Sequence, residues 1–363
     1  MTLTMRAALL VGRGGPEMLE VRDDVEVPVP AGGEALIEVA ACGVNNTDIN
    51  TRVGWYSRAV TTGTSGDGFA EAQADDSTWG RGGLQFPRIQ GADICGRVAA
   101  VAQPADEPLI GRRVLVDPWI RDADEPGDRR LAGYLGSERD GGFAEYCTVP
   151  VRNVYPVESE LGDAELATFA CSWSTAEHML HRVGLGRGQH IAVTGASGGV
   201  GSALVQLARL RGAVVTAIAG GAKLADVRAL GAQQVVDRAV ENVQVAAVEA
   251  GGEQFDVVAD VVGGGDFAGW LEALRRGGRY VTSGAIGGPM VDLDLRTLYL
   301  NDLELFGATV YEPQVFADLV GYIERGEVRP VLAATYPLER IHEAQADFGA
   351  KRHTGNFVIT MAR

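Results

Sequence analysis

The sequence has few of the features that mark membrane, secreted or nucleic-acid-binding proteins. No apolar run approaches the roughly 18 residues that a membrane-spanning helix needs, and the start turns glycine- and charge-containing too early for a signal peptide. Lys and Arg number 32 against 48 Asp and Glu, and the net charge of −16 disfavours phosphate backbones. We therefore expect a cytoplasmic protein that acts on a small-molecule substrate, with no nucleic-acid or membrane partner.

Cysteine is also scarce. The four cysteines, at positions 42, 95, 147 and 171, are widely spaced and form no C-x-x-C pair. A disulfide framework is typical of small secreted chains, which this one does not resemble. We expect Cys42, Cys95 and Cys147 to be buried as small apolar side chains.

The two parts of the chain differ in their pattern of predicted secondary structure. Its 363 residues fit two domains better than one core. The first 150 residues hold short strand-like runs broken by Gly and Pro, which predict a compact antiparallel barrel or sandwich. From about Asp163 onward, strand-like and helix-like runs alternate, which predicts an α/β fold with a doubly wound parallel sheet.

Several individual elements can be predicted within these two parts. A helix is expected over 165–183 with Asp163 as its N-cap, a helix over 315–325 and a strand over 356–360. Residues 55–86 are dense in Gly, Thr, Ser and Asp, and we interpret them as a disordered or lid-like loop. Residues 121–139 form a second polar stretch, which we interpret as another excursion of the chain over the surface.

A glycine-rich loop stands between an apolar strand and a helix. Residues 193–201 read VTGASGGVG. Glycines at such a turn let the backbone approach a pyrophosphate, which the helix N-terminus then binds. This pattern predicts a dinucleotide site with contacts from Gly195, Ala196, Ser197, Gly198, Gly199, Val200 and Gly201.

The end of the next strand indicates which dinucleotide binds. NAD-binding sites carry an acidic side chain there for the ribose 2′-hydroxyl. Here Gly220 and Gly221 end the strand, and no carboxylate comes before Asp226. Lys223 offers a charge for a 2′-phosphate, although a lysine at this place can simply be solvated on a helix. The sequence therefore favours NADPH as the cofactor.

Six ordered motifs resemble the medium-chain dehydrogenase/reductase superfamily, and within it the zinc-free quinone oxidoreductase-like branch. They are 41–48 (ACGVNNTD), 87–98 (PRIQGADICGRV), 141–146 (GGFAEY), 171–176 (CSWSTA), the glycine loop and 277–284 (GGRYVTSG). The resemblance implies a Rossmann NADP-binding domain over 156–311. It also implies a GroES-like β-rich substrate domain over 1–155, completed by 312–363.

The resemblance also bears on metal. Zinc-dependent members bind catalytic zinc through a Cys, a His and a third Cys or similar ligand. By position, Asn45 and Ala92 stand at the first two places, and Cys171 alone matches a ligand. One thiolate cannot provide the three protein ligands of a catalytic zinc site. We expect no metal; a site rebuilt from Asp93, Cys95 and Cys171 is the alternative.

Residues 44–56 supply the candidate catalytic groups. The resemblance implies that Tyr56 is a proton donor or oxyanion partner, that Asn45 is a polar clamp and that Thr47 carries a relay hydroxyl. The alternative is a turn-stabilising role for Asn45 and Thr47, and an ordinary loop aromatic at Tyr56. We interpret His178 and His181, on the expected helix 165–183, as packing or surface residues.

Further coenzyme contacts are expected at the carboxyl edge of the parallel sheet, where ligands bind. They are Ser283, Gly284 and Ala285 after the strand over 279–283, with Thr175 of the 171–176 motif and Asn356 near the C-terminus.

These features predict an NADPH-dependent oxidoreductase that transfers hydride to a quinone or α,β-unsaturated carbonyl without zinc. Two alternatives stay open: a zinc-type alcohol dehydrogenase with an altered metal site, and a non-catalytic NADPH-binding protein. The apolar strand over 303–310 predicts a homodimer through a sheet edge, since members of this superfamily commonly dimerise in that way and an uncovered edge is a liability.

Overall fold

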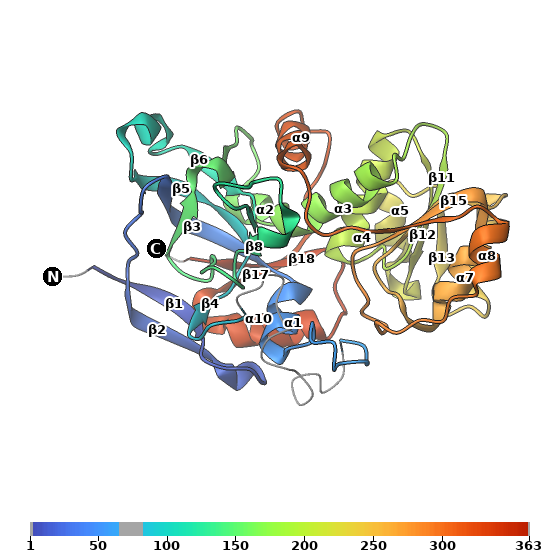
Figure 1. Ribbon diagram of the computed structural model, residues 1–363, viewed down its shortest axis with the longest axis horizontal. Helices are drawn as coiled ribbons and strands as arrows, with labels where there is room; N and C mark the ends of the chain where they lie inside the picture. The colour runs from blue at the N-terminus through green and yellow to red at the C-terminus, as the bar shows by residue number, and fades with distance from the viewer. Residues whose placement is uncertain (1–2, 65–82, 362–363) are drawn as a thin grey trace.

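The computed structural model describes residues 3–64 and 83–361, and Figure 1 shows two bodies side by side, one rich in strands and one of alternating strands and helices. No helix in these two stretches has the length and apolar character needed to cross a membrane. The expected loop over 55–86 falls in large part on residues 65–82, which lie outside the described residues.

The strand-rich body is built around the long strand β3 (Glu34–Val44). Its sequence alternates, and side chains from Ala35 to Ala41 are alternately buried and half-buried, as expected for a strand packed on one face. Neighbours in this sheet are ordered β10-β6-β5-β3-β18-β17, with β9 also paired to β3. The strands of this sheet, besides β3, are β5 (Asp93–Val101), β6 (Arg113–Val116), β9 (Tyr146–Pro150), β10 (Val154–Pro156), β17 (Leu332–Pro337) and β18 (Asn356–Thr360).

Both ends of the chain therefore contribute to one sheet. β18 pairs antiparallel with β3, and Figure 1 shows the late, red strands running into the blue and green body. The strand expected over 356–360 is confirmed with those bounds. The smaller elements here are β1 (Thr4–Leu10), β2 (Leu19–Glu26), β4 (Arg88–Ile89), β7 (Trp119–Ile120), β8 (Gly133–Tyr134), α1 (Asn46–Val53) and α10 (Ile341–Gly349).

The second body is a parallel sheet of six described strands in the order β13-β12-β11-β14-β15-β16. The strand order reverses between β11 and β14, and in folds of this kind ligands bind at the carboxyl ends of the strands at such a point. These strands are β11 (His190–Val193), β12 (Val214–Ala219), β13 (Gln234–Asp237), β14 (Phe255–Asp260), β15 (Leu274–Thr282) and β16 (Glu304–Gly307). Its helices are α4 (Gly199–Leu210), α5 (Leu224–Ala229), α6 (Val243–Gly251), α7 (Phe267–Glu272) and α8 (Leu295–Leu300).

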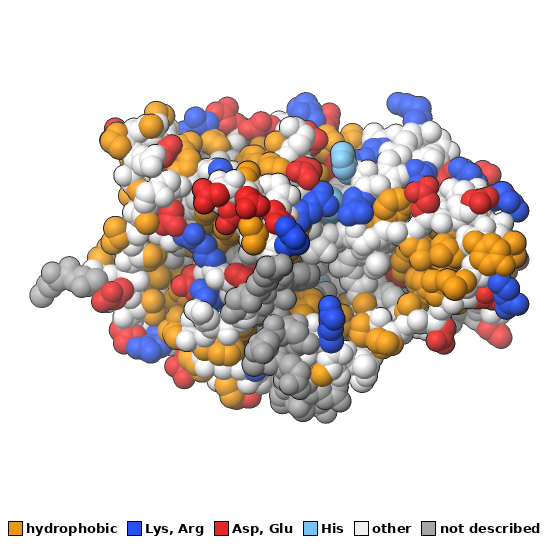
Figure 2. Space-filling model, in the orientation of Figure 1, with side chains coloured by type: hydrophobic (Ala, Val, Ile, Leu, Met, Phe, Trp, Pro, Cys, Tyr) orange, Lys and Arg blue, Asp and Glu red, His pale blue; other side chains and the backbone are white. Residues whose placement is uncertain are grey.

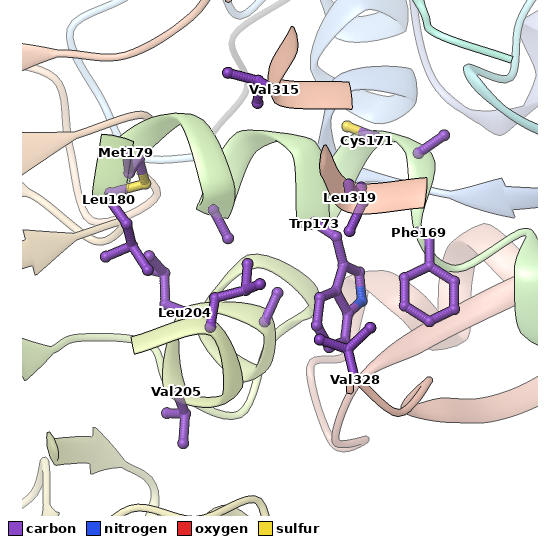
Figure 3. Close-up of a cluster of buried hydrophobic side chains, with 14 of the residues drawn as sticks. Phe169, Cys171, Trp173, Met179, Leu180, Leu204, Val205, Val315, Leu319 and Val328 are labelled. Atoms are coloured by element: carbon purple, nitrogen blue, oxygen red, sulfur yellow. The ribbon is translucent and has the colours of Figure 1, made fainter. Parts of the chain in front are cut away.

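The helix α3 (Ala170–Arg182) lies between the two bodies and packs against α4 and α9 (Pro313–Glu324). Figure 3 shows Trp173 of α3 beside Phe169, Leu319 of α9 and Val328. The Phe169 and Trp173 ring centroids are 4.9 Å apart. Because this core is shared, α3 fixes how the two bodies meet.

The prediction of one helix over 165–183 is wrong. The segment is broken into α2 (Asp163–Leu166) and α3, and Asp163 is the first helical residue after Gly162, not the N-cap. The Thr168 hydroxyl donates to the Glu165 carbonyl at 2.7 Å, a local bond of the kind that competes with a continuous helix. The break allows Phe169 to enter the core.

The remaining expectations can be compared directly. The helix expected over 315–325 begins two residues earlier, at Pro313. The surface excursion over 121–139 carries the 3-10 helix η4 (Arg129–Leu131) and the short strand β8. All four cysteines are buried and unpaired, as predicted for Cys42, Cys95 and Cys147.

Candidate active site

The start of α1 sets the position of the first candidate residue, Asn45. Asn45 follows the last residue of β3 and is the N-cap of α1: its backbone N–H donates to Asp48 Oδ2 at 2.8 Å, as in a capping box. This fixes the side chain toward β5, where Asn45 Nδ2 donates to Asp93 Oδ2 at 2.7 Å. Asn45 thus has a structural bond to a buried carboxylate.

That carboxylate, Asp93, is completely buried. Its other oxygen, Oδ1, accepts a short hydrogen bond from the backbone N–H of Cys171. Burial raises the pKa of Asp93 to about 7, while the hydrogen bonds from Asn45 and Cys171 act in the opposite direction. Asp93 therefore joins α1, β5 and α3 at one point. Sequence reasoning considered it only as a possible metal ligand.

The thiol of Cys171 is the centre of a small group of neutral donors. It makes side-chain hydrogen bonds with Tyr134 and lies beside the Thr47 hydroxyl. The Thr47 Oγ1 atom is buried and, within the described stretches, has no hydrogen-bond partner of ordinary length. Tyr56 lies close enough to interact electrostatically with Cys171, and hydrogen-bonds to the side chain of Asn50.

Burial determines the charge of these groups. It raises the pKa of the Cys171 thiol and of the Tyr56 hydroxyl well above their usual ranges. Both groups therefore keep their protons near neutral pH. The structure brings Thr47, Tyr56 and Cys171 together, with Asn45 joined to them through Asp93, and the buried carboxyls of Asp93 and Asp48 lie near enough to raise the pKa of Cys171 further.

These donors do not fit a catalytic zinc ion. Ala92 has no ligand atom and Asn45 uses its amide on Asp93, which leaves Cys171 as the one ligand among the three positions. Cys95 Sγ lies 3.9 Å from Asp163 Oδ1. Across residues 3–64 and 83–361, no group of three His, Cys, Asp or Glu side chains could hold a metal ion. The alternative ligand set of Asp93, Cys95 and Cys171 is not assembled.

The glycine loop fits a dinucleotide. Gly195 has φ +57°, in the left-handed region that favours glycine. A Cβ on Gly201 would collide with the Gly195 carbonyl oxygen, so only glycine allows the helix α4 to start this close to the loop. Ala196, Ser197, Gly198 and Val200 lie on the same turn, at the N-terminus of α4, where backbone N–H groups can bind phosphate.

A chain of buried hydrogen bonds links this loop to the donor group. Asn356 Nδ2 donates to Ser172 Oγ at 2.9 Å, and Ser172 Oγ donates to Asn45 Oδ1 at 3.4 Å. A Cβ on Gly199 would lie 2.5 Å from Ser172 Oγ and 2.6 Å from Asn356 Nδ2. Asn356 thus supports the loop, and its Oδ1 has no partner in the described part of the chain.

The turn after β15 lies beside the glycine loop. Added Cβ atoms on Gly195 and on Gly284 would both contact Val261, at 2.9 and 3.1 Å. The Ser283 hydroxyl lies 3.0 Å from Met179 Sδ of α3. Ala285 follows on the same turn. Thr175 is the one half-buried residue within the buried stretch 170–180 of α3.

Asp260 organises this edge and was missed by sequence reasoning. It ends β14, is buried, and accepts hydrogen bonds from Thr194 Oγ1 and Tyr280 Oη at 2.5 Å each. It also accepts from the Val262 backbone N–H at 2.8 Å. A carboxylate ending an apolar strand was the available signal.

Basic side chains gather beside Gly220 and Gly221, at the end of β12. The chain has two lysines, Lys223 and Lys351, and both lie here: Lys223 Nζ donates to the Lys351 carbonyl at 2.7 Å. Burial, and then the charge of Lys223, lower the pKa of Lys351 to about 7. Arg238 Nε would be 3.8 Å from a Cβ on Gly220, while Asp237 lies beside Gly221. Sequence reasoning found Lys223 and missed Lys351 and Arg238, which are distant in sequence.

The comparisons with known proteins agree with this architecture. The family model described as "Alcohol dehydrogenase GroES-like domain" matches residues 31–159, and "Zinc-binding dehydrogenase" matches 199–325. The quinone oxidoreductase of Lama guanicoe is 30% identical over 94% of this chain and 93% of its own. An NAD-dependent alcohol dehydrogenase of Sulfolobus acidocaldarius is 27% identical over 98% and 99%.

A solved Sinorhizobium meliloti 1021 protein, provisionally named as an alcohol dehydrogenase, is 48% identical with a TM-score of 0.90, over 99% of this chain and 97% of that one. A thermostable alcohol dehydrogenase from Pyrobaculum aerophilum is 29% identical with a TM-score of 0.81, over 99% and 100%. The chain belongs to the medium-chain dehydrogenase/reductase superfamily. It is an oxidoreductase with a Rossmann-like and a GroES-like part, and this fold implies a nicotinamide dinucleotide.

The Asp93–Asn45 bond gives a first prediction. Asp93→Asn places a second amide N–H₂ against the donors of Asn45 or Cys171, so the free energy of unfolding should fall by about 1–3 kcal/mol. The double exchange Asn45→Asp with Asp93→Asn restores donors opposite acceptors and should recover part of the loss. Urea unfolding of the three proteins measures this. A double variant no more stable than Asp93→Asn alone would contradict the assignment.

The tight glycine contact gives a second prediction. Gly201→Ala forces a Cβ against the backbone of Gly195, and should lower the free energy of unfolding by about 1–3 kcal/mol. Gly32→Ala is the matched control, because nothing lies within 4 Å of its added Cβ. Thermal unfolding of both variants without coenzyme tests the contact. Equal melting temperatures would show that the loop relaxes freely.

Proposed function

We propose that this protein is an NADPH-dependent reductase that transfers hydride to a quinone or an α,β-unsaturated carbonyl without zinc. The observation that carries the proposal is the group of neutral hydrogen-bond donors around Cys171, in the place where zinc-dependent relatives would hold their metal. The quinone oxidoreductases among the relatives support this acceptor class.

The donors suit an acceptor whose charge is spread by conjugation. A bound dihydronicotinamide supplies the hydride. Negative charge then develops on the acceptor oxygen, and hydrogen bonds aimed at that oxygen stabilise it. We assign this role to the Tyr56 hydroxyl, with the Thr47 hydroxyl as a second donor. Asn45 positions the start of α1 through Asp93 and does not need to touch the acceptor.

An isolated ketone or alcohol would depend more on a Lewis acid. The residues around Cys171 do not supply the three ligands that a catalytic zinc ion requires, since Asn45 and Ala92 offer none. We therefore derive no step through a metal. The alcohol dehydrogenases among the relatives make the zinc-type enzyme the second candidate.

The basic cluster supports NADPH over NADH. A 2′-phosphate beside Gly220 and Gly221 would lie among Lys223, Arg238 and Lys351. Charge-assisted hydrogen bonds to phosphate are among the strongest in proteins. The Asp237 carboxylate lies beside Gly221 and would repel a phosphate if left unpaired.

An oxidation screen tests the proposed reaction. NADPH consumption is followed at fixed protein concentration with quinones, enones, enoyl thioesters and simple aldehydes. We expect turnover with conjugated acceptors and little with aldehydes. Turnover confined to aldehydes or alcohols would support the zinc-type enzyme, and no turnover with any acceptor would support a non-catalytic NADPH-binding protein.

Cofactor choice gives a third prediction. NADPH should bind at least about tenfold more tightly than NADH, a difference of about 1.4 kcal/mol. Lys223→Ala should remove most of that difference, because one of the few cations near the 2′-phosphate is lost. Arg228→Ala, an exposed arginine on α5, is the control. Fluorescence titration measures the affinities, and equal affinity of the unmodified protein for both coenzymes would contradict the prediction.

Tyr56 gives a fourth prediction. If its hydroxyl stabilises the developing oxyanion, Tyr56→Phe should lower kcat and kcat/KM together by about 10²–10³-fold, with NADPH affinity nearly unchanged. Thr47 can reduce the size of this loss. Tyr322→Phe, at a half-buried tyrosine of α9, is the matched control. A change confined to KM would mean that Tyr56 only lines the pocket.

We also propose that the protein forms a homodimer through β16 and α8. Apolar side chains are exposed here, and Figure 2 shows them as a continuous orange area over the Rossmann-like body. They include Met290, Leu295, Tyr299, Leu300 and Leu305. Contiguous apolar surface of this kind is typical of an interface, and pairing β16 with its copy would cover an open sheet edge.

The dimer gives a fifth prediction. Leu295→Glu places a charge in the apolar area and should convert a dimer at micromolar concentration into monomers. Val29→Glu changes an exposed apolar residue of the other body and should leave the dimer intact. Sedimentation equilibrium distinguishes the two. A wild-type monomer at micromolar concentration would contradict the proposal.

A further inference from the structure

A polar cavity lies at the C-terminal end of α3, and none of its lining residues belongs to the glycine loop or to the basic cluster around Lys223. Its volume is about 340 Å³, and its lining comes from three separate segments. Arg129 belongs to η4, Glu312 immediately precedes α9, and the other three residues are on α3. The lining residues are Arg129, His178, His181, Arg182 and Glu312.

The cavity is positive although the chain carries a net charge of −16. Arg129 Nη2 pairs with Glu312 Oε1 at 2.8 Å, which leaves Arg182 as the excess cation. In the described part of the chain Arg182 makes no ion pair; its guanidinium lies 5.8 Å from the Phe306 ring centroid. In Figure 2, basic side chains and a histidine gather near the middle of the visible face.

His178 is the second, independent feature. Its side chain is buried at 3% exposure, yet neither ring nitrogen has a hydrogen-bond partner within residues 3–64 and 83–361. Its ring lies edge-on to Tyr311 at 5.9 Å. A buried polar group without a partner costs about 1–3 kcal/mol, so an acceptor placed in the cavity would be favourable.

The charges around His178 select the kind of acceptor. Burial, followed by Arg182, Arg129 and His181, lowers its pKa to about 4, and only Glu312 acts in the opposite direction. An anion would relieve the repulsion among these cations and accept hydrogen bonds from both arginines and from the imidazole. A neutral ligand would not.

We propose that this cavity binds an oxyanion, a sulfate, phosphate or carboxylate group, through Arg182, Arg129 and His178. The site is separate from the coenzyme phosphates. Seven residues of helix place His178 about 10 Å along α3 from Cys171, on the same face. The anion is therefore either a free ion or the charged end of the acceptor molecule.

Sulfate titration calorimetry tests the site directly. The first titration uses the full protein saturated with NADPH, so that the coenzyme phosphate sites are filled. The second uses Lys223→Ala without coenzyme, in which the proposed 2′-phosphate site is weakened, so that the result does not depend on which cofactor binds. We expect Arg182→Gln to weaken sulfate at least about tenfold. The control Arg187→Gln, an exposed arginine on the loop after α3, should leave the affinity unchanged.

Glu312→Gln provides the opposite test. It removes the one carboxylate of the cavity and frees Arg129, so sulfate should bind more tightly. The expected pattern is a loss at Arg182, a gain at Glu312 and no change at Arg187. Absence of sulfate binding, or equal affinities for Arg182→Gln and Arg187→Gln, would overturn the proposal.

The pH dependence gives a separate readout. Sulfate keeps its charge between pH 5 and 8, whereas a bound anion favours protonated His178 and raises its pKa. Affinity should therefore rise as the pH falls. The charged and titratable groups facing this ring are Arg182, His181, Arg129 and Glu312, with Tyr311 and its Asp117–Arg121 pair behind it. A sulfate affinity that stays constant or decreases as the pH is lowered would show that His178 is not part of the site.

A kinetic comparison distinguishes the two sources of the anion, and this step alone rests on the proposed function. An enone carrying a carboxylate is compared with its methyl ester. If the acceptor supplies the anion, Arg182→Gln raises KM for the acid only. If both KM values are unchanged, the ligand is a free ion. An equal rise for both would reject the acceptor as its source. The sulfate titration decides the site itself even if no acceptor is turned over.

Discussion

The buried carboxylate of Asp93 is the constraint on which the rest of the site depends. A charge-bearing group without water must be held by donors, and Asp93 has two: Asn45 Nδ2 and the Cys171 backbone N–H. These donors belong to different elements, so satisfying one carboxylate fixes α1, β5 and α3 together. Ser172 and Asn356 extend the chain to the glycine loop. One buried polar network therefore fixes the position of the residues around Cys171 relative to the glycine loop.

The same network helps to explain why the groups around Cys171 are neutral hydrogen-bond donors and not metal ligands. Asn45 uses its amide to hold Asp93, and Ala92 brings no ligand atom, so Cys171 stands without the partners of a metal site. Burial then keeps the Cys171 thiol and the Tyr56 hydroxyl protonated. In the proposed mechanism, these groups meet the negative charge on a conjugated acceptor by hydrogen bonding.

Much of the fold could be predicted from the sequence, because periodicity and glycine placement are local signals. The glycine loop at 193–201 and the strand ending at Thr360 lie where their patterns indicated. The break in the predicted helix over 165–183 could not be predicted from the local pattern. It depends on the hydrogen bond of the Thr168 hydroxyl and on the burial of Phe169 in the core. Asp93, Lys351 and Arg238 act through residues far away in sequence, and their positions depend on tertiary packing that a single sequence does not encode in any local pattern.

In our proposal, the reaction runs on these protein donors and a nicotinamide, without a catalytic metal. Metal analysis by mass spectrometry, on protein purified without chelator and assayed with its best conjugated acceptor, tests this most directly. We expect well under one zinc ion per chain and a turnover rate that neither a strong chelator nor added zinc changes. Stoichiometric zinc, with activity lost on chelation and restored by zinc, would contradict it.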